Sequence, residues 1–207
     1  MNYLYFGRSC DLNIGNGKTV SAVGKLFSEI VFADKENIWS NIKLNGVEYN
    51  ELTPSSIDEI FECDNAVVLF DELHAIIDIN HKVSSTCKRH SKVGTCFDIS
   101  ELFRQVRKRN ITTLSTVQSF SDCVYRLKIV MQELIICEKY DISTGIYKKC
   151  HEDNCPSDHV HRIKQTNHRN GEIRFFNPEN FYNSYDSSEI VGGWQDCEVD
   201  VQYKKKM

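Results

Sequence analysis

The stretch Gly15-Asn16-Gly17-Lys18-Thr19 opens a predicted helix, and Ala66-Val67-Val68-Leu69-Phe70-Asp71-Glu72 is an apolar run that ends in two acids. The first stretch places small residues where backbone N–H groups can close on phosphate oxygens, then a lysine and a hydroxyl for Mg²⁺. The second is typical of a strand that is buried on both faces and carries a metal-side and a catalytic carboxylate at its tip. Together they predict a site for a nucleoside triphosphate and Mg²⁺, the signature of a P-loop NTPase.

The phosphate loop departs from the usual G-x-x-x-x-G-K-[ST] spacing. Leu12 stands where that pattern has its first glycine, and Gly7 is the nearest glycine upstream. We therefore expect a longer loop than usual, which leaves its path open but keeps the roles of its last residues. The nucleotide-binding candidates are Gly15, Asn16, Gly17, Lys18, Thr19 and Val20, and Thr19 and Asp71 are the candidates for Mg²⁺.

Length and composition favour one α/β domain. The chain has 207 residues, of which 41% are hydrophobic and 26% charged. We expect a single ATPase domain over 1–207, with a core at about 1–140 and a β-rich appendage at about 141–207. No stretch resembles a signal peptide, and no apolar run reaches the roughly 20 residues that span a bilayer. We therefore expect a soluble, intracellular protein whose nine cysteines are reduced.

Helical and strand patterns alternate along the chain. Strands are expected at 3–6, 38–44, 67–71, 111–117 and 133–138, and helices at 18–30, from Pro54, at 100–109 and at 120–128. This rhythm predicts an α/β fold with a mainly parallel central sheet flanked by helices. After Tyr140, turn residues around 143–145 and 170–171 predict C-terminal β-hairpins.

Charge is segregated along the sequence. The net charge is −4, yet residues 79–121 hold eight basic and two acidic side chains. A basic segment of this kind leaves nucleic acid open as a partner, although a solvated surface would look the same. The segment that we expect to grip DNA phosphates carries Lys82, Lys88, Arg89 and Lys92.

A cluster of cysteines and histidines follows the predicted core. Cys150, Cys155, His159 and His161 offer four ligands that could hold a structural Zn²⁺. The spacing C-x4-C-x3-H-x-H is not a standard zinc pattern, so scattered thiols and solvent-facing histidines remain the alternative.

A family resemblance rests on the segment from Phe103 to Gln118. Its arginine-bearing helix end, the next strand and the terminal Thr116-Val117-Gln118 resemble the FtsK/HerA group of DNA-pumping ATPases. The chain resembles, over nearly its whole length, the genome-packaging ATPases of archaeal viruses with internal membranes. The further segments that carry this resemblance are D-E-L-H, R-K-R-N, T-V-Q-S-F, R-L-K-I and Phe181-Tyr182-x-x-Tyr185-Asp186-Ser187-x-Glu189-Ile190.

The resemblance implies roles for individual residues. Glu72 would be the general base that polarises the attacking water, and Gln118 the sensor that orients it. Arg107, with Arg104 and Arg109 behind it, would supply positive charge to the site of a neighbouring subunit, although one of these arginines could instead pair with DNA or an acid. The implied fold is RecA-like, of the ASCE type, with strand order 5-1-4-3-2.

The resemblance further implies an ATP-driven translocase that packages double-stranded DNA into a preformed capsid. Its partners would be duplex DNA, a homo-oligomeric ring, most simply a hexamer, and a capsid or internal-membrane vertex protein. It would work in the host cytoplasm and, transiently, at the vertex of the assembling virion. Two alternatives remain: a Zot-like virion assembly or secretion ATPase, and a nucleotide-dependent switch that is not a motor. Glu72 argues against a pure switch, which needs no catalytic base.

Overall fold

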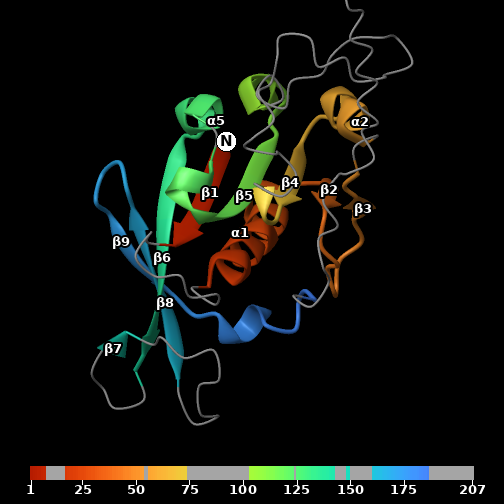
Figure 1. Cartoon of the computed structure of the whole chain (residues 1–207). Helices are drawn as coiled ribbons and strands as arrows, with labels where there is room; N and C mark the ends of the chain where they lie inside the picture. Colours follow the sequence, from red (N-terminus) through yellow and green to blue (C-terminus); the bar gives the residue numbers. More distant parts are fainter. Residues whose placement is uncertain are drawn as a thin grey trace, which may run out of the picture.

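A mainly parallel β-sheet forms the centre of the molecule (Figure 1). The computed structural model describes residues 1–7, 17–53, 56–73, 103–123, 125–142, 148–149 and 160–186. The strands are β1 (Asn2–Gly7), β2 (Asn37–Ser40), β3 (Asn50–Glu51), β4 (Ala66–Phe70), β5 (Thr112–Ser119), β6 (Glu133–Asp141), β7 (Lys148–Lys149), β8 (His161–Asn167) and β9 (Ile173–Phe176). The α-helices are α1 (Lys18–Ala33), α2 (Ile57–Glu62) and α5 (Tyr125–Val130), and 3-10 turns are η2 (Val106–Arg109), η3 (Phe120–Asp122) and η4 (Glu179–Phe181).

The sheet has the order β3-β2-β4-β5-β1-β6-β8-β9, with β7 paired to β6. All neighbours from β3 to β6 are parallel, whereas β8 and β9 add antiparallel strands. The five strands expected from the sequence correspond to β1, β2, β4, β5 and β6, whose order β6-β1-β5-β4-β2 is the expected 5-1-4-3-2. The predicted α/β fold class and the strand order are therefore confirmed.

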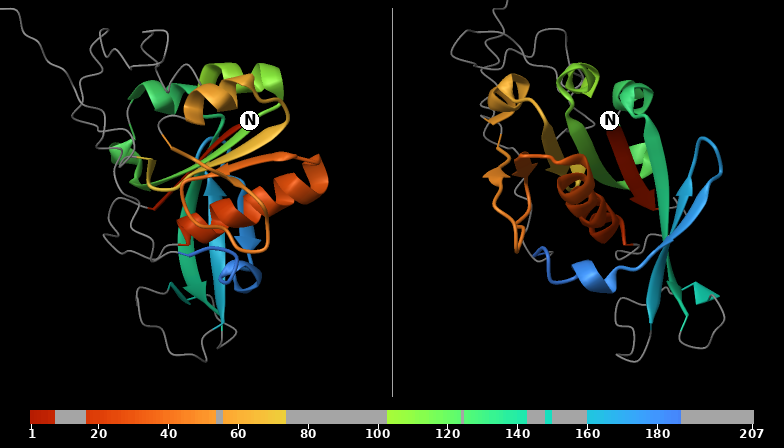
Figure 2. Two further views of the ribbon diagram at one scale, coloured as in Figure 1. Left: turned by 90° about the vertical axis from the view of Figure 1, so that its right-hand side faces the viewer. Right: turned by 180° about the vertical axis from the view of Figure 1, so that it is seen from behind.

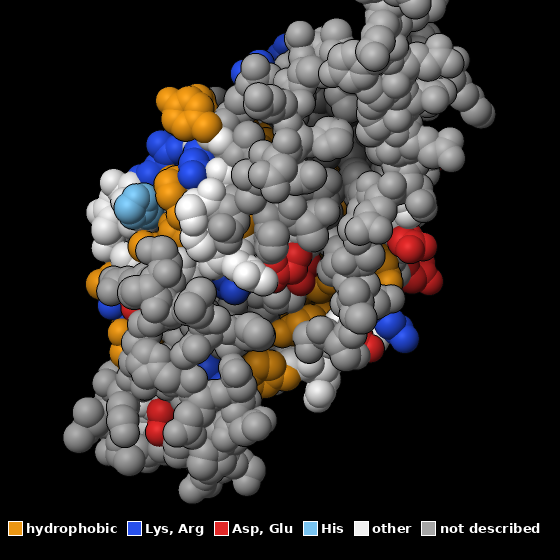
Figure 3. All heavy atoms as spheres, in the orientation of Figure 1, with side chains coloured by type: hydrophobic (Ala, Val, Ile, Leu, Met, Phe, Trp, Pro, Cys, Tyr) orange, Lys and Arg blue, Asp and Glu red, His pale blue; other side chains and the backbone are white. Residues whose placement is uncertain are grey.

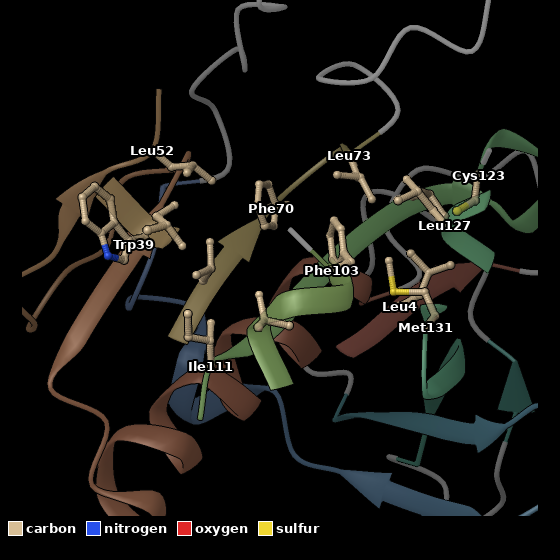
Figure 4. Packing of buried hydrophobic residues seen from close by; sticks show 14 of the residues in the cluster. Leu4, Trp39, Leu52, Phe70, Leu73, Phe103, Ile111, Cys123, Leu127 and Met131 are labelled. Carbon is tan, nitrogen blue, oxygen red and sulfur yellow. The ribbon is translucent and has the colours of Figure 1, made fainter. Parts of the chain in front are cut away.

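Helices cover both faces of the sheet, which explains why β4 is apolar throughout. Val67 and Leu69 belong to the cluster that packs under α1, whereas Val68 and Phe70 belong to the cluster on the opposite face. Figure 2 shows α1 on one side of the sheet and α2 and α5 on the other. Figure 4 shows the second cluster, in which the Phe70 and Phe103 rings lie 5.6 Å apart. Because apolar side chains and helices cover both faces of the sheet, every residue of β4 is buried.

Most boundaries differ from those expected by a few residues, and two helices and one strand differ in their course. The second strand ends at Ser40 rather than at 44, because the Ser40 hydroxyl donates to the Ile42 carbonyl at 2.7 Å and turns the chain. The helix expected at 100–109 is described from 103, and its last residues form η2 before Asn110 takes a left-handed φ of 53°. The helix expected at 120–128 is divided into η3 and α5.

The C-terminal part of the described chain packs against α1. The hairpin expected at 170–171 joins β8 to β9, and Gly171 has a φ of 73° in its turn. Residues 177–186, which we call the strap, then pass below α1 toward β2 (Figure 1). Phe181 in the strap stacks on Phe176 at 5.4 Å and lies 6.0 Å from Phe27 of α1, measured between ring centroids. These rings attach the strap to the helix that follows the phosphate loop.

Within the described ranges, no helix combines the length and hydrophobicity that crossing a membrane requires.

Gly24→Ala tests the packing of the C-terminal part on α1. In a helix interior, alanine is normally more stable than glycine by about 0.5–1 kcal/mol. Here the added Cβ would lie 2.5 Å from Cζ of Phe176. We expect the variant to lose about 1–3 kcal/mol of unfolding free energy, measured by urea denaturation. In a Phe176→Leu background the same change should be neutral or stabilising, and equal destabilisation in both backgrounds would contradict this packing.

Candidate functional site

The two motifs that opened the sequence meet at the carboxyl ends of β1 and β4. Asp71 follows β4 directly, and Thr19 is the second residue of α1. The Thr19 hydroxyl donates to Oδ1 of Asp71 at 2.9 Å. Asp71 is only 8% exposed, so this bond forms in a site largely shielded from water. The helix after the phosphate loop and the acidic strand tip are therefore joined in one site.

Thr116 of β5 connects the two acids and was not predicted as a site residue. Its hydroxyl donates to the same Oδ1 of Asp71 at 2.7 Å and accepts from the backbone N–H of Glu72 at 2.9 Å. The side chain is fully buried, and β5 pairs with β4 in a register that brings Thr116 beside Asp71. A single hydroxyl thus fixes the direction of one carboxylate and the backbone of the next residue.

Asn41 is a second residue that the sequence did not single out. Its side-chain amide donates to the Asp71 carbonyl at 2.8 Å, and its side-chain oxygen accepts from the Asp71 N–H at 2.7 Å. These two bonds satisfy the backbone of Asp71 just where the sheet ladder ends. Asn41 lies just after β2, within the stretch that was expected to be strand. Because β2 ends at Ser40, the Asn41 side chain can bond to the backbone of Asp71.

Gly17 and Lys18 lie at the start of α1, where the surrounding residues restrict the first and bury the second. Gly17 has a φ of 79°, and a Cβ there would lie 2.3 Å from Cδ1 of Ile163 on β8, so only glycine fits. Lys18 is buried, as is Val20 in the next turn. Burial raises the pKa of Cys137 on β6 to about 12, although the Ser21 hydroxyl and the Lys18 charge act to lower it. The Cys137 thiol therefore stays neutral at neutral pH.

Glu72 lies in the turn after β4 with a left-handed φ of 52°. The left-handed conformation costs a non-glycine residue about 1–2 kcal/mol of local strain. The bond from its N–H to Thr116 helps to hold this conformation, and the side chain is partly buried. The carboxylate predicted as the base therefore starts from a constrained backbone next to Asp71.

Gln118 lies near the end of β5 and its side chain is exposed. Phe6 of β1 pairs with Val117, but Gly7 pairs with Ser119, so Gln118 is the extra residue of a β-bulge. Bulges change the direction of a side chain and are common beside active sites. Gln118 therefore lies beside Gly7 at the end of β1.

Arg107 lies at the opposite end of the sheet from Asp71. Its turn, η2, precedes β5, and the carbonyl of Arg109 accepts from the N–H of Asn65 at 3.0 Å, just before β4 begins. Parallel strands have their carboxyl ends at one edge, so the amino ends of β4 and β5 are remote from the Asp71 edge. The fold does not bring Arg107 to the site of its own chain.

Most of the other predicted residues lie outside the described ranges. They are Gly15 and Asn16 of the phosphate loop, the expected DNA-binding residues Lys82, Lys88, Arg89 and Lys92, and Cys150, Cys155 and His159 of the expected zinc cluster. His161, the fourth zinc candidate, is the first residue of β8. Among described residues, no group of three or more His, Cys, Asp or Glu side chains could hold a metal ion by itself.

The donor set nevertheless fits a hydrated Mg²⁺ bound together with a triphosphate. Magnesium prefers oxygen ligands and usually takes only one or two from the protein, the rest coming from water and phosphate. Thr19 offers a hydroxyl oxygen whose hydrogen is directed at Asp71, and Asp71 offers a carboxylate in the same site. Thr19 and Asp71 would therefore hold the cation, and this assignment stays a prediction.

Thr116→Val tests the role of the shared hydroxyl. Valine keeps the branched shape but leaves Asp71 with one donor fewer and the Glu72 N–H without its acceptor. Losing partners for buried groups costs about 1–3 kcal/mol, so we expect a drop of this size in unfolding free energy, measured by urea denaturation. Thr116→Ser retains the hydroxyl and serves as the control. Equal stability of the two variants would rule out this role.

Comparison with known proteins supports the fold. Neither a protein-family model nor a curated protein matches the sequence. Among solved structures, the crystal structure of the N-terminal domain of zonular occludens toxin from Neisseria meningitidis matches with a TM-score of 0.50. Sequence identity is 10%, and the match covers 89% of this chain and 98% of that chain. With the strand order and the joined motifs, this likeness shows that the chain has an α/β fold of the P-loop ATPase type.

Proposed function

We propose that this protein hydrolyses ATP and uses the energy to move double-stranded DNA into a preformed viral capsid. The observation that carries the ATPase part is the joint hydrogen bonding of Thr19 and Thr116 to Asp71, which sets a phosphate-binding helix against an acidic strand tip. The translocation part is supported by the resemblance of the chain to FtsK/HerA ATPases and to packaging ATPases of archaeal viruses, and by the basic segment 79–121.

In the proposed reaction, the N–H groups at the start of α1 and the Lys18 ammonium bind the phosphates of ATP. Thr19 and Asp71 would hold Mg²⁺, which would supply positive charge to stabilise the phosphate oxygens. Glu72 accepts a proton from the attacking water, and Gln118 orients that water. Thr116 holds Asp71 and Glu72 in fixed relative positions, so that both carboxylates act from one rigid edge.

Arg107 acts in a neighbouring subunit in this proposal. Because η2 lies at the amino ends of the strands, Arg107 is remote from Asp71 of its own chain, which favours a role in trans over one in cis. A finger supplied by a neighbour requires a closed ring in which each subunit completes the next site. We propose a homo-oligomeric ring, most simply a hexamer, that docks on a capsid or internal-membrane vertex protein.

Duplex DNA is proposed to contact the basic segment that contains Lys82, Lys88, Arg89 and Lys92. The acid-rich flank of the described molecule is a poor surface for phosphates. Figure 3 shows acidic side chains at the edge beside β2 and β3. Among the side chains that the structure describes between residues 34 and 64, the exposed acids are Asp34, Glu36, Glu48, Glu51, Glu59, Glu62 and Asp64. Repulsion from this flank would favour a DNA path elsewhere.

A protein-moving ATPase of virion assembly or secretion is the second candidate that the sequence leaves open. The zonular occludens toxin domain is 10% identical, so its likeness supports the fold and favours neither candidate. The effect of duplex DNA on the rate of ATP hydrolysis distinguishes the two candidates. A DNA translocase should hydrolyse ATP faster when duplex DNA is added, whereas an ATPase that moves protein should not respond to DNA.

Lys18→Ala and Glu72→Gln test the two halves of the reaction. The Lys18 charge meets the phosphates in the ground state, so Lys18→Ala should abolish binding of a fluorescent ATP analogue. Glu72→Gln should bind that analogue normally but hydrolyse ATP at least about 100-fold more slowly, because it lacks the base. Steady-state phosphate release, with and without duplex DNA, measures this. Full turnover by Glu72→Gln would show that the base is misassigned.

Replacing Lys88, Arg89 and Lys92 by alanine tests the DNA path. A packaging motor must accept any sequence, so it should bind phosphates rather than bases. The triple variant should weaken binding equally for unrelated duplexes and reduce the slope of log affinity against log salt by about two to three units. ATP hydrolysis without DNA should be unchanged. Alanine at Lys204, Lys205 and Lys206 removes the same charge and is the control, and a reduced slope in the control alone would place the DNA path at the C-terminus.

A further inference from the structure

The two edge strands of the described sheet, β3 and β9, lie at its opposite ends and run in the same direction (Figure 1). β3 is parallel to β2, and β2 is parallel to β4 of the core. β9 is antiparallel to β8, which is antiparallel to β6, so β9 again follows the direction of the core strands. A second copy of the chain in the same orientation can therefore place its β3 beside β9 and continue the sheet as a parallel pair.

β9 presents apolar side chains at this edge. Ile173 is 52% exposed and Phe175 is 49% exposed. Arg174 lies between them and shares a face with Phe176, because side chains alternate along a strand. Phe176 contacts α1, so Arg174 is on the α1 face of the sheet, whereas Ile173 and Phe175 are on the opposite face. An exposed edge strand with apolar side chains is a surface on which another chain can pair.

The two edges carry charge of opposite sign. Residues 161–176, which include β8 and β9, contain four Arg or Lys and one acid. Residues 34–64, which include β2 and β3, contain eight acids and two lysines. Arg174 bonds to Glu172 of its own hairpin at 2.8 Å, but both side chains are well exposed, and such a pair is weak. The guanidinium has further N–H groups with which it can bind a second carboxylate.

A groove at the β2–β3 edge matches β9 in both charge and polarity. It has a volume of about 560 Å³ and is lined by Glu36, Ile38, Val47, Glu48, Tyr49 and Asn50. Its apolar residues belong to, or pack against, the cluster under α1, so the groove lies on the α1 face. Glu36 and Glu48 are exposed. The groove therefore offers two carboxylates on the same face of the sheet as Arg174.

We propose that the occupant of this groove is a second copy of the chain, whose β9 lies beside β3 and whose Arg174 binds Glu36 and Glu48. The contact joins two different surfaces, so each copy keeps one free edge of each kind. Such head-to-tail association builds a ring when its rotation closes and a filament when it does not. The inference goes beyond the proposed hydrolysis of ATP, because the contact needs no nucleotide.

Charge reversal on each side of the contact tests the pairing. Sedimentation velocity without nucleotide measures self-association of the full chain. Arg174→Glu places a negative charge against two acids, so we expect association at least about tenfold weaker, and Glu48→Arg should have the same effect from the other side. Arg174→Lys keeps the positive charge and is the matched control, which should associate as the starting protein does. All of these side chains are exposed, so the fold should be retained.

Mixing the two reversed variants separates this contact from other modes of association. Each variant presents one edge that is complementary to the other variant, so an equimolar mixture should regain the affinity of the starting protein, as should the double variant. A starting protein that stays monomeric, an equal loss with Arg174→Lys, or a mixture without recovery would overturn the inference. Loss with Arg174→Glu alone would point to contact between two β9 strands and would overturn it too. If the starting protein stays monomeric and Arg174→Glu weakens binding of duplex DNA, the hairpin contacts DNA instead. These measurements hold whether or not the protein hydrolyses ATP, so this inference and the proposed function can fail separately.

Discussion

One carboxylate oxygen, Oδ1 of Asp71, accepts hydrogen bonds from hydroxyls on two different elements. Thr19 belongs to α1, on one face of the sheet, and Thr116 belongs to β5, the strand next to β4. A buried carboxylate is stable only when its oxygens have partners. This oxygen therefore links α1 and β5 to the tip of β4, and the Thr116 hydroxyl extends the link to the Glu72 turn. The same arrangement leaves Thr19 and Asp71 side by side, as a cation bound with a triphosphate requires.

The sequence was sufficient to predict the parts of the fold that depend on local pattern. The glycine-lysine-threonine run and the apolar strand that ends at Asp71 predicted the motifs that the fold brings together. Alternation of strand and helix patterns predicted the parallel sheet, and the resemblance supplied its strand order. The expected end of the second strand was wrong, because the Ser40 hydroxyl turns the chain after it. The expected single domain stays a prediction.

Two site residues could not be predicted because their roles depend on contacts far along the chain. Asn41 is a polar residue after a strand, and only the fold shows that its side chain hydrogen-bonds to the N–H and the carbonyl of Asp71. Thr116 had a signal, since it is a hydroxyl residue on a strand buried on both sides, two positions before Gln118. The contact between Ile163 and the Gly17 position joins residues far apart in sequence, and no local pattern encodes it.

The most direct test of this account is a crystal structure of Glu72→Gln with Mg²⁺ and ATP. The account predicts the triphosphate against the start of α1, at Gly17 and Lys18, with Mg²⁺ held by the Thr19 hydroxyl and by Asp71, directly or through one water. Thr116 should still donate to Oδ1 of Asp71. Nucleotide bound elsewhere, or Mg²⁺ held by residues other than Thr19 and Asp71, would contradict it.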